Sequence, residues 1–215
     1  MKLTPPRQHS NETFINIVSN SIHMYQKRNK ELDIISLYSG DYKSRFYLRQ
    51  IGKLAKLPLK TCQNTLASLE REKILKGKIE GKNKYFSLNL DNIHVKSCLL
   101  KAEINKTDAF LKRYPEFKTF LKSINTNSVL IIFGSFAKFK ADKNSDLDLF
   151  IISDKEEKLP FHLMPRKVHQ NSLKEESFKK AVAENETLIK EIEENHIILN
   201  NPSAYVNIVW EYHGR

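Results

Sequence analysis

Two aspartates separated by one residue, Asp146 and Asp148, are the side chains of this sequence best suited to chemistry. They open the segment Asp146 to Ile152, whose apolar residues predict a β-strand. Side chains two positions apart in a strand project from the same face, so the two carboxylates are expected to lie side by side. Like charges so placed repel each other unless a cation lies between them. Mg²⁺ suits this position, because it takes oxygen ligands and leaves coordination positions for water and substrate phosphates.

A glycine and a serine form the second part of this candidate site. Gly134 and Ser135 follow a continuous apolar run, Val129 to Phe133, which predicts a strand buried on both faces. Glycine lets the backbone approach a ligand where a Cβ would clash, and backbone N–H groups at the start of a helix bind anions. We therefore expect Gly134 and Ser135 to bind an anion such as a phosphate group, with Lys138 and Lys140 as further contacts.

Gly134 and Ser135, ten intervening residues, and then Asp146-Leu147-Asp148 resemble the signature of DNA polymerase β-type nucleotidyltransferases, and most of all their minimal nucleotidyltransferase branch. The resemblance covers roughly residue 125 to the C-terminus. It implies that one or two Mg²⁺ ions, held by Asp146 and Asp148, assist transfer of a nucleoside monophosphate from an NTP to an acceptor hydroxyl. It implies in addition that Gly134, Ser135 and Lys138 bind the NTP. It suggests a toxin–antitoxin or regulatory setting with a protein acceptor or toxin as partner, while the acceptor stays open between a protein side chain, an RNA end and a small molecule.

The sequence departs from this family where a third carboxylate is expected on a later strand. The candidate strand, Arg166 to Gln170, carries His169 at this point. An imidazole is a poor Mg²⁺ ligand, but it can contact a phosphate, act as a base, or serve a structural role. Asp154, Glu175 and Glu176 are weaker substitutes for the acid. The alternative function is therefore a DNA-binding transcriptional regulator whose nucleotide-binding domain is catalytically degenerate.

The net charge of +11 is concentrated in the N-terminal part of the chain. Residues 1–90 hold 17 Lys and Arg against 7 Asp and Glu, whereas residues 91–215 hold 19 against 18. Such an asymmetry predicts a module that binds a polyanion, joined to a module that does something else.

The order of elements predicted in this basic part is similar to that of a winged helix-turn-helix. Helices are expected over Glu12–Asn29, Glu31–Tyr38, Tyr47–Lys56 and Lys60–Glu72, followed by strands at Ile74–Glu80 and Lys84–Leu90. The helix over 60–72 would be the recognition helix. Its outward residues that can reach phosphates or base edges are Lys60, Thr61, Gln63, Asn64, Ser68 and Arg71, and the wing lysines are Lys76, Lys78, Lys82 and Lys84.

We expect this module to bind double-stranded DNA, with RNA binding and a protein-contact role as alternatives. The overall prediction is an α+β fold with three segments. These are an N-terminal winged helix domain (1–90), a helical connector (91–124) and a C-terminal nucleotidyltransferase-fold domain with a small mixed sheet flanked by helices (125–215). In the connector, a long helical stretch is expected from Asp91 to Pro115, and a second helix over Glu116–Ile124. The apolar residues of the first stretch are Ile93, Leu99, Leu100, Ile104, Phe110 and Leu111. Lys174–Glu194 is predicted as one amphipathic helix with Leu188 inward, before a strand at His196–Asn200.

Several broad classes of protein are disfavoured by composition. No apolar run approaches the length of a membrane span, and the N-terminus lacks the apolar core of a signal peptide. Cys62 and Cys98 have no ligand-like spacing and are expected to be buried thiols. We expect a cytoplasmic protein; its oligomeric state is open, with a dimer as one option.

Overall fold

The structure is a computed structural model that describes residues 29–164 and 166–214. Its contacts divide the chain into Met1–Lys30 and Glu31–Arg215, and the described helices and strands belong to the second unit, apart from Lys30 at the start of the first helix. The helix predicted over Glu12–Asn29 falls almost wholly outside the described residues.

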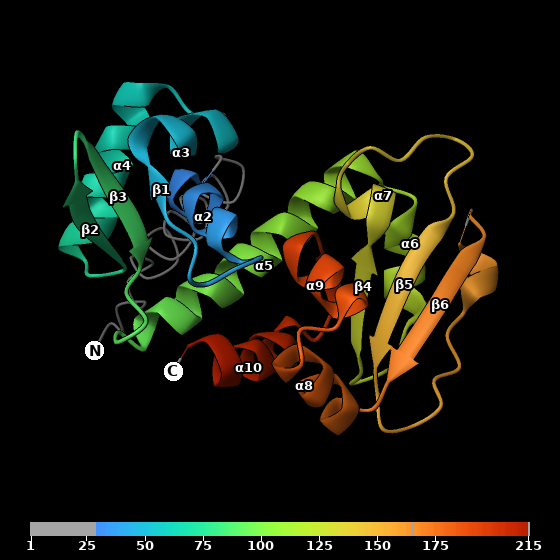
Figure 1. Ribbon diagram of the computed structural model, residues 1–215. Coiled ribbons are helices and arrows are strands. Elements are labelled where there is room, and N and C mark those ends of the chain that lie inside the picture. The colour runs from blue at the N-terminus through green and yellow to red at the C-terminus, as the bar shows by residue number, and fades with distance from the viewer. Residues whose placement is uncertain (1–28, 165, 215) are drawn as a thin grey trace, which may run out of the picture. The chain divides into compact units, whose positions relative to one another are not determined.

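The N-terminal elements of this unit combine short helices with a three-stranded antiparallel sheet (Figure 1). They are, in chain order, α2 (Lys30–Ile35), η1 (Ser36–Tyr38), β1 (Phe46–Tyr47), α3 (Leu48–Leu54), α4 (Leu59–Arg71), β2 (Leu75–Glu80) and β3 (Asn83–Leu88). The strands lie in the order β1-β3-β2, and β2 and β3 form the predicted hairpin around Gly81. Leu66 and Leu69 of α4 are buried, whereas Leu54 is 52% exposed because α3 ends at that residue.

The C-terminal elements are built on a four-stranded mixed sheet in the order β6-β5-β4-β7. The strands are β4 (Val129–Phe133), β5 (Leu147–Ile152), β6 (Val168–Leu173) and β7 (Ile197–Asn200). β4 pairs antiparallel with β5 and β7, whereas β5 and β6 are parallel. The short helices α7 (Gly134–Ala137) and η2 (Phe161–Leu163) lie in the connections. The mixed sheet flanked by helices confirms the predicted α+β class and fits a nucleotidyltransferase-fold domain.

Helices cover both faces of this sheet, so β4 is buried throughout, as its continuous apolar run predicted. Leu130 and Ile132 pack in one cluster with aromatic residues of α5 (His94–Arg113) and α6 (Phe117–Ser123). Ile131 and Phe133 point the other way, into a cluster with residues of α8 (Glu175–Ala183), α9 (Thr187–Glu194) and α10 (Pro202–His213). The alternation follows from the two-residue period of a strand.

The second cluster continues into the N-terminal elements, where it includes Tyr38 and Leu66. Tyr42 also lies against Trp210 of α10, with ring centroids 6.2 Å apart. The predicted segment boundary at residues 90 and 91 stays a prediction, and the hydrophobic core extends across it.

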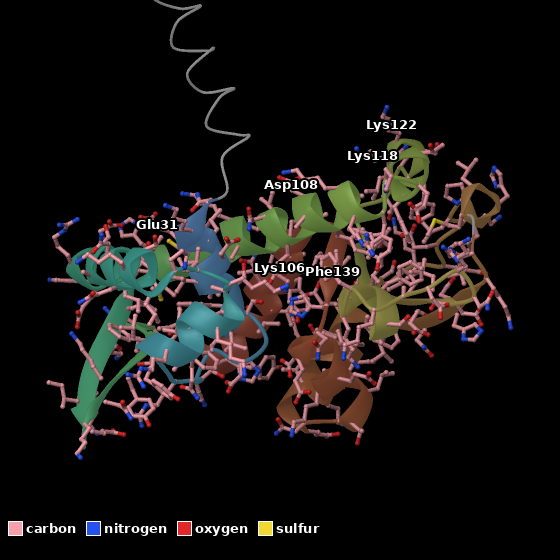
Figure 2. All side chains as sticks on the ribbon, turned by 90° about the horizontal axis from the view of Figure 1, so that it is seen from above. Glu31, Lys106, Asp108, Lys118, Lys122 and Phe139 are labelled. Carbon is pink, nitrogen blue, oxygen red and sulfur yellow. The ribbon has the colours of Figure 1, made fainter. Side chains whose placement is uncertain are left out.

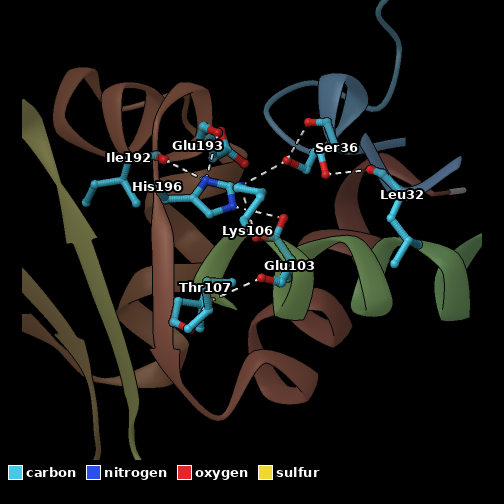
Figure 3. Close-up of polar contacts among 10 residues, drawn as sticks. Leu32, Ser36, Glu103, Lys106, Thr107, Ile192, Glu193 and His196 are labelled. Atoms are coloured by element: carbon cyan, nitrogen blue, oxygen red, sulfur yellow. Dashed lines mark hydrogen bonds and ion pairs between the residues drawn. The ribbon is translucent and has the colours of Figure 1, made fainter. Parts of the chain in front are cut away.

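A buried polar network joins α5 to the segment before β7 (Figure 3). Glu103 Oε1 lies 3.0 Å from His196 Nε2, and Glu103 Oε2 forms an ion pair of 3.0 Å with Lys106 Nζ. Lys106 also donates to the hydroxyl of Ser39, at 3.0 Å, which ties in the end of η1. Burial alone would raise the pKa of Glu103, but the charges and hydrogen bonds of His196 and Lys106 lower it to about 2.

One predicted helix is wrong in detail. The helix expected over Lys174–Glu194 is two helices, α8 and α9, because Asn185 adopts a left-handed backbone conformation (φ 53°) that ends the first. The change of direction turns Leu188 outward, where it is 37% exposed. Two apolar residues of the predicted connector are exposed, Ile93 by 65% and Ile104 by 46%. Ile93 precedes α5, and Ile104 lies off the buried stripe of this helix, which consists of Val95, Leu99, Ala102, Glu103 and Phe110.

The two cysteines differ in burial. Cys62 is buried and Cys98 is half-buried, and both are free thiols. Within residues 29–164 and 166–214, no helix combines the length and apolar character that crossing a bilayer requires.

Candidate functional site

Three neighbouring strands bring the predicted site residues into one row. Phe133, the last residue of β4, pairs with Asp148 of β5, and Asp148 in turn pairs with His169 of β6. Gly134 follows Phe133 directly and begins α7. Gly134, Asp148 and His169 therefore meet at one end of the sheet, although the chain separates the last two by twenty residues.

Gly134 is required where it stands for two reasons. Its backbone lies in the left-handed region (φ 67°), which residues other than glycine rarely adopt. A Cβ at this position would also overlap the carboxylate of Asp148. The Gly134 backbone therefore lies close to the Asp148 carboxylate, whereas its approach to a ligand stays a prediction.

Both aspartates face the same imidazole, so they share a face as predicted. His169 Nε2 is 3.3 Å from Asp146 Oδ2, and His169 Nδ1 is 4.0 Å from Asp148 Oδ1. Asp146 immediately precedes β5, and all three side chains are part-exposed, by 41% for Asp146, 34% for Asp148 and 49% for His169. The imidazole therefore lies where a cation between the two carboxylates would be favourable.

The surroundings of Asp148 shift the pKa of its carboxyl group upward. Partial burial is the largest cause, and the neighbouring carboxylates of Glu191 and Asp146 add to it. His169 and Lys138 act in the opposite direction but do not cancel the rise. A carboxyl whose ionised form is disfavoured gains from any further cation placed beside it.

Lys138 and Glu191 form an ion pair that sequence reasoning missed. The Lys138 ammonium, just past the end of α7, is 3.0 Å from Glu191 Oε1 on α9. Nothing in the sequence distinguished Glu191 from the other acids of this amphipathic helix. Lys140, the other predicted phosphate contact, has an exposed side chain, and its N–H donates to the carbonyl of Ser135 at 2.9 Å.

The loop before Asp146 is held by local hydrogen bonds. Asp142 accepts from the N–H of Asn144 at 2.8 Å and from the hydroxyl of Ser145 at 3.1 Å. These bonds lower the pKa of Asp142. The guanidinium of Arg166 donates to the carbonyls of Asp142 and Lys143, which fixes the loop against the start of β6. Arg166 is a second residue whose contribution sequence reasoning missed.

The three acids considered as substitutes for a third carboxylate lie elsewhere. Asp154 follows the far end of β5, about 20 Å from Asp148 at the rise of a strand. It accepts a bond of 3.4 Å from the N–H of Glu175, and Glu175 and Glu176 pair with Lys179. A cavity of about 430 Å³, lined in part by Asn127, Ser153 and Asp154, also lies at that far end, away from Asp146.

The residues predicted to contact DNA are mostly exposed. On α4 the exposed residues are Lys60, Gln63, Asn64 and Arg71, whereas Thr61 and Ser68 are half-buried. On the hairpin, Lys76, Lys78, Lys82 and Lys84 are exposed. Lys84 Nζ is 2.7 Å from Glu70 Oε2, Lys76 pairs with Asp91 at 3.0 Å, and Lys78 pairs with Glu80 at 3.2 Å. Part of the positive charge of the hairpin is therefore offset by neighbouring acids.

Comparison with known families supports the interpretation of the C-terminal part of the chain. Residues 115–205 match the family model described as nucleotidyltransferase domain. The match contains Gly134, Ser135, Asp146, Asp148 and His169, and it supports a transferase domain in this part of the chain. It covers less than half of the 215 residues. Searches of curated proteins and of solved structures gave no match.

Proposed function

We propose that the protein is a Mg²⁺-dependent nucleotidyltransferase that moves a nucleoside monophosphate from an NTP to an acceptor hydroxyl. The observation that carries this proposal is the convergence of Asp146 and Asp148 on one point beside Gly134, within a segment that matches the nucleotidyltransferase domain. We further propose that the N-terminal elements bind DNA.

The two carboxylates of the candidate site suit Mg²⁺. Asp146 and Asp148 supply carboxylate oxygens, which this ion prefers, and their mutual repulsion is relieved by a cation. Among the residues that the structure describes, no group of three or more His, Cys, Asp or Glu could hold a metal. Mg²⁺ commonly keeps several waters and binds through one or two carboxylates together with substrate phosphates. In this proposal Asp146 and Asp148 are the two protein ligands.

The protein groups around this pair would position the triphosphate. The backbone N–H groups and hydroxyl of Gly134 and Ser135 bind phosphate oxygens, and Lys138 leaves Glu191 to contact the same anion. When bound, Mg²⁺ stabilises the charge that develops on the attacking and leaving oxygens. The acceptor oxygen forms a bond to the α-phosphorus as the bond to pyrophosphate breaks. His169 is the nearest group suited to receive the hydroxyl proton.

A transfer assay tests this function directly. The full-length protein is incubated with Mg²⁺ and each α-³²P-labelled NTP, alone and with cell lysate, and products are separated as protein, RNA and small molecules. We expect label in one acceptor class with wild type, and none with Asp148→Asn. A protein acceptor would agree with the toxin partner that the family resemblance implies. Binding of NTP without any transfer would favour the alternative, a DNA-binding regulator with a degenerate nucleotide site.

The DNA-binding proposal rests on charge and topology. Helices α3 and α4 precede an antiparallel hairpin that pairs with β1, and this order of elements supports the proposal of a winged helix. The exposed residues of α4 can reach base edges, and Lys82 and Lys84 on the hairpin can contact phosphates. Because phosphate contacts release counterions, affinity should fall steeply as salt is raised.

Salt titration of full-length protein on duplex DNA tests this second proposal. Lys82→Ala should weaken binding on all sequences and reduce the log–log salt slope by about 1. Gln63→Ala or Asn64→Ala should change sequence preference instead. Lys180→Ala, an exposed lysine of α8, is the matched control and should leave DNA affinity unchanged. Absence of binding at low salt would make the N-terminal elements a protein-contact module.

A further inference from the structure

The two aspartates of the candidate site are held in place by different means. Asp148 belongs to the ladder of β5, where it pairs with residues of both neighbouring strands. Asp146 immediately precedes β5, so the sheet anchors only the chain that follows it. The chain that leads to Asp146 is a loop, residues 138–146, and Figure 2 shows its second residue, Phe139, beside α7. The position of Asp146 therefore depends on how this loop is fixed.

Hydrogen bonds within the loop give it a shape but no fixed place relative to β6. Asp142 accepts from the N–H of Asn144 at 2.8 Å and from the hydroxyl of Ser145 at 3.1 Å, so these partners all belong to one turn. Near the start of the loop, the N–H of Lys140 donates to the carbonyl of Ser135 at 2.9 Å, which anchors that end to α7. None of these bonds anchors the end of the loop that leads into β5.

Arg166 supplies the contact between this end of the loop and β6. Its Nη1 donates to the carbonyl oxygen of Asp142 at 3.2 Å and also to that of Lys143. The carbonyl of the next residue, Lys167, accepts from the N–H of Leu147, the first residue of β5, at 2.8 Å. β6 begins one residue later. The guanidinium is a rigid planar donor, and two carbonyls bound to it are held in a fixed relation to the start of β6.

This arginine acts on the carboxylates through the loop and not by contact. Its guanidinium lies 5.8 Å from the centroid of the Phe136 ring, which is fully buried. Phe136 packs in one cluster with Leu147 and Leu149 of β5. Successive side chains of a strand point to opposite faces, so this cluster lies on the face of the sheet opposite to Asp148. Arg166 is therefore a candidate for positioning a ligand of the metal, and not for binding the metal or the phosphates.

Mg²⁺ makes the position of Asp146 important. This ion demands near-ideal octahedral geometry, so two protein carboxylates that share one ion must be held at a defined separation. Groups that orient metal ligands without touching the metal change metal affinity by about tenfold to hundredfold when they are removed. A half-buried arginine that fixes the loop in front of one ligand belongs to this class of group.

We propose that Arg166 is a positioning residue of the metal site, which holds Asp146 at the separation from Asp148 that a shared Mg²⁺ requires. The inference rests on the proposed function, since it requires Mg²⁺ and an NTP at these two carboxylates. Lysine should replace this arginine only in part, because an ammonium is a point charge on a flexible stem.

Calorimetry of the full-length protein tests this role. ATP is titrated at a series of Mg²⁺ concentrations into wild type, Arg166→Ala and Arg166→Lys. The Mg²⁺ midpoint, defined as the concentration that gives half-maximal ATP binding, should rise about tenfold to hundredfold in Arg166→Ala and by less in Arg166→Lys. ATP affinity at saturating Mg²⁺ should stay as in wild type, because the arginine does not contact the phosphates. If Arg166→Ala does not fold, Arg166→Lys alone carries the comparison.

Two controls separate positioning from a general loss of structure. Arg113, at the end of α5, also lies over a buried ring, 5.9 Å from the centroid of Tyr114, and Arg113→Ala should leave the Mg²⁺ midpoint unchanged. Millimolar guanidinium chloride, compared with sodium chloride at equal ionic strength, should return the midpoint of Arg166→Ala toward that of wild type. The free cation can occupy the place of the missing side chain, whereas a loss of folded structure would not be reversed by a denaturant.

Each other outcome has a distinct meaning. An unchanged Mg²⁺ midpoint in Arg166→Ala overturns the positioning role and leaves the proposed function intact. Weaker ATP binding at saturating Mg²⁺, with no shift of the midpoint, also overturns it, because Arg166 would then contact the nucleotide or support the fold in general. If wild type does not bind ATP at any Mg²⁺ concentration, the proposed function fails and the positioning role fails with it.

Discussion

The backbone of Gly134 lies so close to the carboxylate of Asp148 that no side chain fits between them. Gly134→Ala therefore adds two costs, the strain of a positive φ and an overlap with Asp148. We expect it to abolish NTP and Mg²⁺ binding in calorimetry, because Asp148 or α7 must move. The control is Gly81→Ala, at φ 59° with open space around it, which carries strain of about 1–2 kcal/mol without the overlap. Equal destabilisation and intact NTP binding in both variants would contradict the importance of this contact.

Asp148→Asn should remove metal binding yet stabilise the protein without metal. The raised pKa of Asp148 means that the folded state binds this proton more tightly than the unfolded state. Stability is therefore lost as pH rises from the ordinary aspartate pKa through the raised one, and the loss is complete above it. We expect a small gain, about 1–2 °C in Tm, for Asp148→Asn at pH 7, and no gain at pH 3. The exposed acid Asp108 provides the control, since Asp108→Asn should give no such pH-dependent difference.

Replacement of His169 separates a role at the site from a structural role. Its side chain is part-exposed on the edge strand β6, so His169→Ala should change stability by less than about 0.5 kcal/mol. His169→Asp would place three carboxylates together, and we expect lower Tm without metal but tighter Mg²⁺ binding. Thermal melts with and without Mg²⁺ measure both effects. A large loss of stability in His169→Ala, with no gain in Mg²⁺ affinity in His169→Asp, would make the histidine structural.

The buried pair of Glu103 and His196 should dominate acid stability. Because the pKa of Glu103 is lowered to about 2, its contribution is present above the ordinary glutamate pKa and is lost as pH falls toward 2. Glu103→Gln leaves His196 and Lys106 without their carboxylate, and we expect a loss of about 3–5 kcal/mol at pH 7. Urea unfolding from pH 7 to pH 2 should show the difference from wild type shrinking with acid.

An exposed ion pair provides the control for the buried pair of Glu103 and His196. Glu184 pairs with Lys180 at 3.8 Å, with both side chains more than half exposed. Glu184→Gln should cost less than about 1 kcal/mol at any pH. If Glu103→Gln is no more destabilising than Glu184→Gln, the buried network contributes little to stability.

The sequence by itself determined the features that depend on local pattern. The apolar run of β4 predicted a strand buried on both faces. The two-residue period of a strand predicted that Asp146 and Asp148 lie on one face. The need for glycine at position 134 was also readable, because a glycine between a buried strand and a polar loop has few other reasons to be there. The match to the nucleotidyltransferase domain agrees with these local signals.

Only the tertiary structure decided which other side chains reach the aspartates. His169 lies beside Asp148 because β6 pairs with β5 in parallel, and the sequence of either strand does not specify this pairing. Glu191 reaches Lys138 because Asn185 ends α8 and lets α9 take its own direction, a break that helical periodicity concealed. Pairing and packing between distant segments set these positions, and a local pattern carries no information about them.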